Sequence, residues 1–411
     1  MKLGGVPRAE QEVLSMISLD EARRHIVEIL QPTGSVPLAL SDASGRILAE
    51  PMVAQCTQPP FPASAMDGYA VRSMDLGNVP VRLRLGGESA AGHAFSGTVE
   101  PGMAVRISTG APLPEGTDQV VIQERSVRDG DDVILDDTAR PMSNVRRAGV
   151  DFSKGDILLP EGARAAPEAV ALAASAGLTA LTVHRHPKIG VLATGDELVE
   201  PGEPAGPSQI VNSVSKGVIE TVRAWGAEPV YLGIARDNVD DVKSRLAAGA
   251  GLDLVVTIGG ASVGDHDHLR QVFARDGGEL YFEKIAVKPG KPTWFGRLGG
   301  VPYLGLPGNP VSALVIAQLL LQPAVWRLEG CSHPPVYDRA RLGCALVAND
   351  YREGFLRGWC DDQGVVTPLD NQDSSALSAL ARANCLIRRP AEAPASAPGD
   401  ATDILPLAGR R

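Results

Sequence analysis

The stretch Leu252–Asp267, with the sequence LDLVVTIGGASVGDHD, joins an apolar run to a loop rich in glycine and polar residues. The apolar run predicts a buried strand over Leu252–Ile258, because strands covered on both faces read as nearly continuous Val, Ile and Leu. A polar, glycine-rich loop directly after such a strand is typical of a ligand site in an open α/β sheet. This stretch therefore predicts both the class of fold and the place of the site.

Predicted strands and amphipathic helices alternate around this stretch, which indicates an α/β domain with a mostly parallel sheet. We expect this domain to span residues 188–328. The expected strands are Lys188–Ala193, Glu228–Ala235 and Leu252–Ile258, with further extended runs near 280–287, 293–297 and 301–306, and the expected helices are Val214–Trp225, Val239–Ala248, Leu269–Arg275 and one from about Asn309.

The N-terminal part begins with a helix signal. Ser18 and Glu21 have the spacing of a capping box, in which each residue's side chain bonds the other's backbone amide. We expect this helix to run to about Leu30, with Gly34 beyond it as a stop signal. Short extended pieces are expected over residues 35–53.

Two further regions read as mainly β structure. From about residue 54 to 140, short alternating runs between Gly and Pro turns predict a β-rich module. Residues 332–411 contain short strands and no long helix, which fits a small β-barrel or sandwich. Between these regions an Ala-rich helix is expected over Ala166–Ala176, with Gly177 as its C-terminal cap.

Composition limits the partners and the compartment. The chain has 411 residues and a net charge of −10, from 39 basic and 49 acidic side chains, which argues against nucleic acid as a partner. Its five cysteines are odd in number and form no CxxC pair, as expected for reduced thiols in the cytoplasm. The N-terminus has no apolar signal core, and the apolar stretch Val311–Trp326 is interrupted and short for a membrane span. We expect a cytoplasmic protein without a membrane partner.

The loops that follow the predicted strands are rich in glycine, charge and polar side chains. Because the carboxyl ends of parallel strands meet at one edge of a sheet, we expect these loops to form one site. The loops are Thr194–Glu197, Arg236–Asp237, Gly259–Asp267, Lys288–Pro292 and Leu306–Pro310.

Three of these loops carry features suited to an anion. The glycines of Gly259–Gly264 allow successive backbone amides to face a phosphate, although a plain strand–helix turn would look the same. Asn309 and Pro310 predict an N-cap and first residue of a helix whose N-terminus would favour negative charge, or simply an ordinary helix start. Lys288 and Lys291 could pair with an oxyanion or remain solvated surface lysines.

The same loops carry the carboxylates Asp196, Glu197, Asp237, Asp265 and Asp267. Carboxylates beside a phosphate-binding loop suit Mg²⁺, which takes one or two carboxylates together with substrate phosphates. Loop capping and solvation are the alternative for any one of them. A transition-metal site in the run 265–268 is a weaker alternative, because histidines at i and i+2 do not share a helix face.

The β-rich module adds two tight turns of small residues, Ser64–Ala70 and Ser108–Pro114. Each holds a polar side chain, Asp67 and Thr109 respectively, whose purpose the residues alone do not reveal.

Seven segments, taken together and in order, resemble the molybdopterin molybdenumtransferase family, which includes bacterial MoeA and the C-terminal domain of gephyrin. They cover all but the C-terminal quarter of the chain. The segments are SAMDGYAVR (64–72), STGAPLPEGTDQVVIQE (108–124), NVRRAGVD (144–151), VLATGDELVEPG (191–202), GGASVGDHD (259–267), VKPGKP (287–292) and LPGNPVSA (306–313).

The resemblance implies a multidomain α/β plus β fold. Its parts would be an elongated, discontinuous helix and strand domain (1–53 and 141–187), the β-rich module (54–140), a three-layer α/β domain similar to MogA and MoaB (188–328) and a C-terminal β-barrel (329–411). The implied reaction inserts molybdate into adenylylated molybdopterin and releases AMP with Mg²⁺. A homodimer whose site is shared between subunits is also implied, with a separate adenylyltransferase upstream. Adenylylation of molybdopterin by this chain, or a scaffold role as in gephyrin, are the alternatives.

Site residues follow from the matched positions. The acidic and catalytic set would be Asp67, Thr109, Asp151, Glu197, Asp237 and Asp267, of which Glu197, Asp237 and Asp267 would hold the metal. The substrate-binding set would be Gly259, Gly260, Ser262, Gly264, Lys288, Lys291, Pro307, Asn309 and Pro310. The sequence departs from the family pattern at Pro62, Ala63, Val150 and His268, which puts fine substrate contacts in doubt and not the reaction class.

Overall fold

The computed structural model describes residues 16–260, 268–331 and 336–407. The chain divides into two compact units. One comprises Met1–Ser35 and His184–Arg411, and the other is Val36–Val183. The second unit is thus an insertion into the first, and each is described separately below.

The first unit is built around a six-stranded sheet with the order β16-β13-β17-β21-β20-β18. The first four strands are parallel, and the last two are antiparallel to their neighbours. The mostly parallel sheet is therefore confirmed. The strands are β16 (Glu228–Ala235), β13 (Lys188–Thr194), β17 (Leu254–Ile258), β21 (Val301–Leu306), β20 (Trp294–Leu298) and β18 (Glu279–Phe282).

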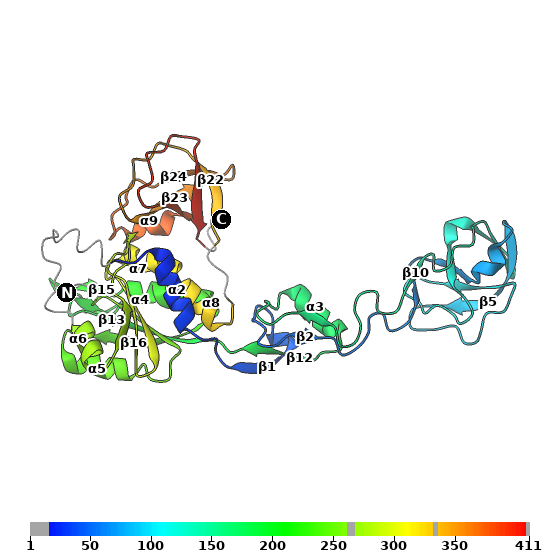
Figure 1. Ribbon diagram of the computed structural model, residues 1–411, viewed down its shortest axis with the longest axis horizontal. Helices are drawn as coiled ribbons and strands as arrows, with labels where there is room; N and C mark the ends of the chain where they lie inside the picture. Colours follow the sequence, from blue (N-terminus) through cyan, green and yellow to red (C-terminus); the bar gives the residue numbers. More distant parts are fainter. Residues whose placement is uncertain (1–15, 261–267, 332–335, 408–411) are drawn as a thin grey trace, which may run out of the picture. The chain divides into compact units, whose positions relative to one another are not determined.

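Helices cover both faces of this sheet, as Figure 1 shows, which makes the three layers predicted for this domain. One apolar cluster joins the sheet to α2, α4, α7 and α8, and a second cluster on the other face joins it to α5 and α6. The helices are α2 (Leu19–Ile29), α4 (Val214–Ala224), α5 (Val239–Ala247), α6 (His268–Arg275), α7 (Pro310–Ile316) and α8 (Gln322–Leu328).

Most of the predicted boundaries agree with the structure to within one or two residues, but the extended run expected near 280–287 is split into β18, which ends at Phe282, and a separate short strand at Val287–Lys288. The capping box at the start of α2 is present: Glu21 N donates to Ser18 Oγ at 3.2 Å, and Ser18 N donates to Glu21 Oε2 at 2.8 Å. The strand predicted from Leu252 begins only at Leu254. The reason is Asp253, whose carboxylate accepts the amide of Lys188 at 2.7 Å and pairs with Arg185, so this residue ends a turn.

A π-helical turn, Ala317–Leu321, joins α7 to α8. Pro323 has no N–H, so it cannot bond the carbonyl of Leu319 four residues earlier. Arg23 of α2 replaces that donor, with its Nε 3.1 Å from Leu319 O. The whole run Pro310–Leu328 has 19 residues and is apolar enough to cross a membrane by length and composition. Of its most apolar window 72% is buried, so its apolarity serves the core of this unit.

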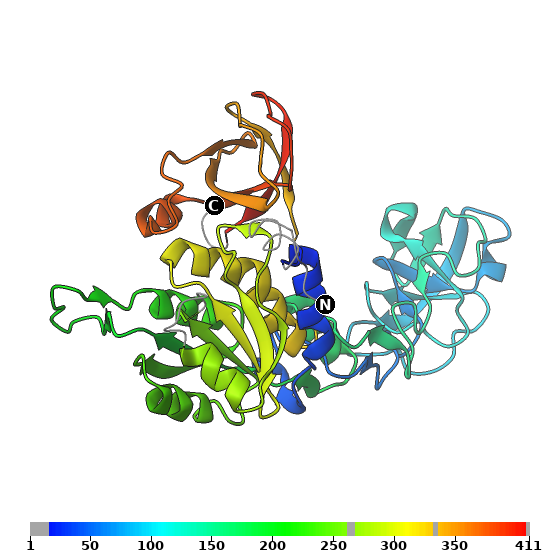
Figure 2. The same cartoon turned by 60° about the vertical axis from the view of Figure 1, so that its left-hand side comes forward.

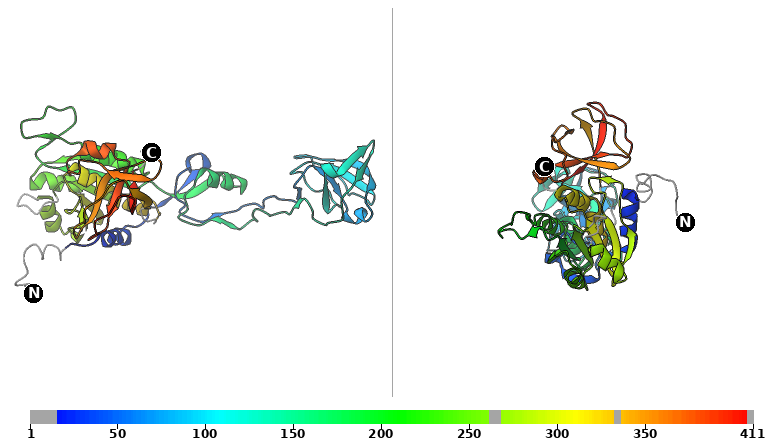
Figure 3. Two further views of the ribbon diagram at one scale, coloured as in Figure 1. Left: turned by 90° about the horizontal axis from the view of Figure 1, so that it is seen from above. Right: turned by 90° about the vertical axis from the view of Figure 1, so that its left-hand side faces the viewer.

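The C-terminal part of the first unit is a closed barrel, which confirms the barrel over the sandwich. Its strands follow the order β23-β24-β22-β26-β25, and β25 pairs back to β23. Strand β19 (Val287–Lys288) of the α/β part adds to β23 in parallel. Figures 1 and 3 show the barrel strands, in orange and red, beside the yellow helices α7 and α8. The elements are β22 (Asp338–Leu342), β23 (Glu353–Cys360), β24 (Val365–Pro368), β25 (Cys385–Arg389), β26 (Ala401–Pro406) and α9 (Leu377–Arg382).

The two largest apolar clusters among the described residues of the second unit mark its two main cores. One lies around α3 (Pro167–Ser175), which has Pro at its first turn and Gly177 at a φ of 82° beyond its end, as predicted. Short strand pairs β1–β12 and β2–β11 flank this helix. These strands are β1 (Ser35–Ala39), β12 (Ala180–His184), β2 (Met52–Val53) and β11 (Ile157–Leu159).

The other core belongs to the β-rich module, a six-stranded sheet with the order β7-β4-β6-β5-β9-β8. The alternating runs Val81–Leu85 and Ala104–Ile107 of this region lie within β5 and β6. The strands are β7 (Gln119–Ile122), β4 (Gly68–Val71), β6 (Met103–Ile107), β5 (Val81–Ser89), β9 (Asp132–Leu135) and β8 (Ser126–Asp129), with the separate pair β3 (Ala63–Ser64) and β10 (Val145–Arg146) and short 3₁₀ turns at Leu40–Asp42, Ser73–Leu76 and Gln123–Arg125.

Candidate functional site

A cavity of about 820 Å³ lies at the carboxyl ends of the parallel strands in the first unit. The strand ends meet at this edge because their registers align: Thr194 pairs with Ala235, and Ile258 pairs with both Ala193 and Leu306. The cavity brings together seven of the predicted site residues. They are Glu197, Asp237, Gly259, Gly260, Pro307, Asn309 and Pro310.

Two carboxylates line this cavity from neighbouring strand ends. Glu197 follows β13 after Gly195, which has a φ of 141° and whose missing Cβ leaves room for the Glu197 carboxylate. Asp237 follows β16 and exchanges bonds with Asp196: Asp237 N donates to Asp196 Oδ1 at 3.1 Å, and Asp196 N donates to Asp237 Oδ2 at 3.3 Å. Asp196 therefore orients the loops, and Glu197 and Asp237 carry the charge of the cavity wall.

Backbone glycines form the wall after β17. Gly259 and Gly260 have φ values of 88° and 59°, conformations that side-chain-bearing residues rarely adopt. A Cβ on Gly259 would come within 2.9 Å of Thr194 O, so only glycine fits there. Ser262, Gly264 and Asp267 lie outside the described residues. Among the residues that the structure does describe, no three His, Cys, Asp or Glu side chains gather as a metal centre.

The start of α7 differs from the prediction in one respect. Pro310 does occupy the first turn and Asn309 the N-cap position, but the Asn309 side chain caps no amide of the helix. Its Nδ2 donates to Ser374 Oγ of the barrel at 3.1 Å, and the amide of Val311 donates to Ser374 O at 3.0 Å. The capping acceptor thus comes from the barrel loop, and the next residue of that loop, Ser375, lines the cavity. No local pattern in the sequence shows that the loop of Ser374 and Ser375 lies beside Asn309.

The two predicted lysines flank a turn beside the cavity. Pro292 lines the cavity, whereas Lys288 and Lys291 are not among its lining residues. Lys288 is exposed, with its Nζ 3.9 Å from Asp350 Oδ2. Gly290 lets the turn pack on α7, because a Cβ there would overlap Ile316. Their role as substrate ligands stays a prediction.

In the second unit, Asp67 and Thr109 lie together. The amide and the hydroxyl of Thr109 both donate to Asp67 Oδ1, at 2.8 and 3.2 Å. Both residues are exposed. Asp151 is exposed as well, and its amide donates to Gln58 O at 3.1 Å. The sequence suggested these residues through the resemblance, and the first two form one polar group.

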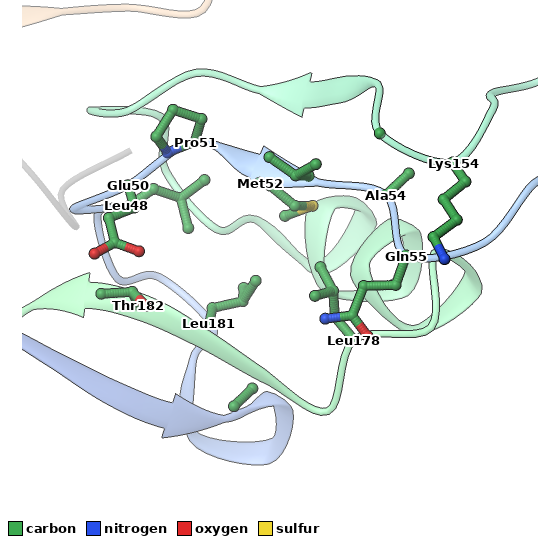
Figure 4. A pocket seen from close by; sticks show the side chains of 13 residues that line it. Leu48, Glu50, Pro51, Met52, Ala54, Gln55, Lys154, Leu178, Leu181 and Thr182 are labelled. Carbon is green, nitrogen blue, oxygen red and sulfur yellow. The ribbon is translucent and has the colours of Figure 1, made fainter.

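A second cavity, of about 680 Å³, lies near α3 in the second unit. Figure 4 shows Glu50 and Thr182 at one end of it and Gln55 and Lys154 at the other, with apolar side chains such as Met52 between them. None of the predicted site residues lines it.

A polar cluster that the sequence analysis did not identify lies behind the first cavity, where Tyr231 OH donates to Glu200 Oε1. Burial, and then the bond to Glu200, raises the pKa of Tyr231 to about 12, so this hydroxyl is a donor at neutral pH. Burial of Glu200 would raise its pKa, but hydrogen bonds from Lys216 and Tyr231 outweigh burial and hold the pKa below its ordinary value.

Comparison with known proteins adds to this geometry. Three family models match the chain: MoeA N-terminal region (domain I and II) over residues 17–177, probable molybdopterin binding domain over 190–327, and MoeA C-terminal region (domain IV) over 339–407. A molybdopterin molybdenumtransferase from Haemophilus influenzae is 39% identical over 383 residues, covering 90% of this chain and 94% of that protein. The chain belongs to the molybdopterin molybdenumtransferase family.

Further relatives of this transferase family agree. The molybdopterin molybdenumtransferase of Bacillus subtilis is 32% identical, over 91% of this chain and 90% of its own length. The crystal structure of the molybdopterin biosynthesis MoeA protein from Pyrococcus horikosii superimposes with a TM-score of 0.82 at 29% identity, covering 96% of this chain and all of that one. The protein is a transferase of molybdenum cofactor biosynthesis that acts by molybdenum insertion, as the resemblance implied.

Proposed function

We propose that the protein inserts molybdate into adenylylated molybdopterin and releases AMP in a step that depends on Mg²⁺. The observation that carries this proposal is one cavity in which Glu197 and Asp237 face Gly259 and Gly260. An adenylylated substrate contains a pyrophosphate, which calls for both backbone donors and neutralisation of charge.

The donor set of the cavity fits Mg²⁺. Glu197 and Asp237 both offer hard carboxylate oxygens from the same cavity, and Mg²⁺ uses one or two carboxylates while substrate phosphates and water complete its shell. When bound, the ion would neutralise the charge that develops as the phosphoanhydride is cleaved. Asp267, which lies outside the described residues, is proposed as a third oxygen ligand.

The backbone amides and lysines near the cavity suit the phosphate and molybdate anions of the proposed reaction. Backbone amides near Gly259 and Gly260 would donate to phosphate oxygens, because positive φ at both residues turns the chain sharply around the cavity. Lys288 and Lys291, on the turn that precedes Pro292, would meet molybdate, a tetrahedral dianion, from the side of the barrel. Pro307 and Pro310 hold the loop between them in shape.

We assign Asp67, Thr109 and Asp151 to the same reaction as contributions of a second copy of the chain. Their unit holds exposed polar groups and none of the residues that line the α/β cavity. The working form would then be a homodimer with two shared sites. A separate adenylyltransferase would supply the substrate, and the reaction would take place in the cytoplasm.

The test is an insertion assay with purified adenylylated molybdopterin. Molybdate and Mg²⁺ together should yield active cofactor and one AMP for each molybdenum inserted. Omission of Mg²⁺ should stop both, and tungstate in place of molybdate reports the preference between the two oxyanions. AMP release without insertion would contradict the coupling.

A parallel incubation with molybdopterin, ATP and Mg²⁺ tests the adenylyltransferase alternative. Accumulation of adenylylated molybdopterin without molybdate would overturn our assignment. Normal molybdoenzyme activity in cells that carry only the Glu197→Ala variant would instead favour a scaffold role.

A further inference from the structure

A polar network joins the rear of the cavity to the edge of the sheet. Asn212 Nδ2 donates to Tyr231 OH at 2.9 Å, and Tyr231 OH donates to Glu200 Oε1. Ser215 Oγ donates to Asn212 Oδ1 at 2.8 Å. Lys216 closes the network, with its Nζ 2.8 Å from Glu200 Oε2 and 4.2 Å from the centre of the Tyr231 ring.

The network ties down two very short strands. β14 (Leu198–Val199) pairs in parallel with β15 (Ile210–Val211), and Figure 2 shows the segment between them projecting from the α/β part in green. Strands of two residues contribute little stability by themselves. Glu200 directly follows β14 and Asn212 directly follows β15, so the network holds the ends of both strands through Tyr231 on β16.

The same strand pair carries a wall of the cavity. Ile210 N donates to Glu197 O at 2.7 Å, and Asn212 N donates to Val199 O at 2.8 Å. Glu197, Leu198, Ile210 and Val211 all line the cavity. Ile210 and Val211 are 61% and 46% exposed, so burial of their side chains does not fix the strand.

The network itself offers little to a ligand. Asn212 lines the cavity but is only 2% exposed, and both atoms of its amide bond within the network. Tyr231 is not among the residues that line the cavity. These side chains therefore act on the site through the backbone that they hold.

We propose that Tyr231 is a positioning residue for molybdenum insertion: through Asn212 and Glu200 it holds β14–β15 and so places Glu197 in the cavity. This inference rests on the role proposed above for Glu197. Removing the Tyr231 hydroxyl takes away the bond from the buried Asn212 amide and the bond to Glu200, and the loss of buried hydrogen bonds destabilises the arrangement that buries them.

Tyr231→Phe removes this hydroxyl and keeps the ring beneath Lys216. Tyr281→Phe is a matched control, because Tyr281 OH donates to Glu279 Oε2 at 3.1 Å from β18, at the opposite edge of the same sheet. Hydrogen exchange reports the positioning without any activity. We expect the amides of Ile210 and Asn212 to exchange about tenfold faster in Tyr231→Phe and at the normal rate in Tyr281→Phe.

Kinetics then connect this change to Glu197. Tyr231→Phe should lower kcat/KM for insertion about tenfold in the intact protein and should add no loss in a Glu197→Ala background, since the residue acts through Glu197. Tyr281→Phe should cost nothing in either background. If Tyr231→Phe caused only a general structural defect, its fold-loss in kcat/KM would instead multiply with the fold-loss caused by Glu197→Ala.

Unchanged exchange at Ile210 and Asn212, or multiplying losses, would overturn the inference and leave the proposed function intact. Full activity of Glu197→Ala alone would contradict the proposed role of Glu197 and the inference together.

Discussion

The amide and the hydroxyl of Thr109 converge on a single oxygen of Asp67, Oδ1. Among the residues that the structure describes, none donates a hydrogen bond to Asp67 Oδ2. The turn around Thr109 thus fixes the direction of an exposed carboxylate whose second oxygen is open to a ligand. A surface aspartate held in this way is suited to a task beyond stability.

Asp67→Asn keeps an acceptor for Thr109 and removes the charge. We expect kcat/KM for insertion to fall about 100-fold. Rate losses of this size are usual when one charged or acid–base group is removed from an active site. The unfolding temperature should stay unchanged, because Asp67 is exposed. Asp131→Asn, at an exposed turn of the same module, is the control and should change neither quantity. If the Asp67→Asn enzyme inserts molybdenum at the normal rate, the Asp67 carboxylate has no part in the site.

Mixing two strongly impaired variants tests whether the site is shared between subunits. Asp67→Ala and Glu197→Ala chains, once subunit exchange is shown by mass spectrometry of a tagged pair, should form heterodimers with one intact site in two. Activity should return to at most about half of the wild-type value per heterodimer. Failure to recover any activity despite proven exchange rules the shared site out.

Removing a negative charge from the cavity should raise the Mg²⁺ concentration that insertion requires. Glu197→Gln and Asp237→Asn keep the size and hydrogen-bonding capacity of each side chain, and Mg²⁺ binding loses one anionic ligand in each. We expect the Mg²⁺ concentration for half-maximal insertion to rise about tenfold or more in both. Glu228→Gln, near Lys188 at the opposite end of the same strands, should leave the Mg²⁺ requirement as it is.

The depressed pKa of Glu200 predicts a pH-dependent difference in stability. An acid whose pKa is lower in the folded state stabilises the fold above its unfolded pKa of 4.5, and this contribution is lost as the pH falls through the folded value. Glu200→Gln should therefore unfold at a lower temperature than the wild type near neutral pH, and the gap should narrow below about pH 4.5. Thermal melts at several pH values measure this; a gap that is constant with pH would contradict it.

The donor that compensates for Pro323 should matter for stability. Arg23→Ala leaves Leu319 O without the guanidinium that bonds it, and the side chain of Arg23 is only 13% exposed. We expect a loss of about 1–3 kcal/mol in the free energy of unfolding, measured with urea. Arg24→Ala, at the next, exposed position of the same helix, should cost much less.

Repeating local patterns made much of the α/β fold predictable. The strand Glu228–Ala235 was predicted with its observed bounds, and the capping box of Ser18 and Glu21 is present atom for atom. Alternating strands and helices require a mostly parallel sheet, which places the strand-end loops at one edge. Glu197, Asp237 and Gly259 met there for that reason.

What the sequence could not reveal depends on contacts between distant segments. Asn309 is at an N-cap position with a residue type that usually caps, yet its amide bonds Ser374, 65 residues away. The Tyr231 network similarly joins residues from β16, α4 and the ends of β14 and β15, and no spacing along the chain relates them. Asp67 and Thr109 were singled out as turns with an unexplained polar residue, and only the fold brings them into contact.

The barrel loop around Ser374 forms hydrogen bonds with the first turn of α7, so the barrel and the α/β part are not independent modules. Separate family models end at residue 327 and begin again at 339, yet β19 pairs with β23, and Phe355 and Leu386 of the barrel share one apolar cluster with the α/β sheet. A chain cut between the two models would expose that cluster and leave the amide of Val311 without Ser374. Recombination between members of the family should therefore exchange the α/β part and the barrel together, and the natural seams lie instead near residues 35 and 184, where the inserted unit begins and ends.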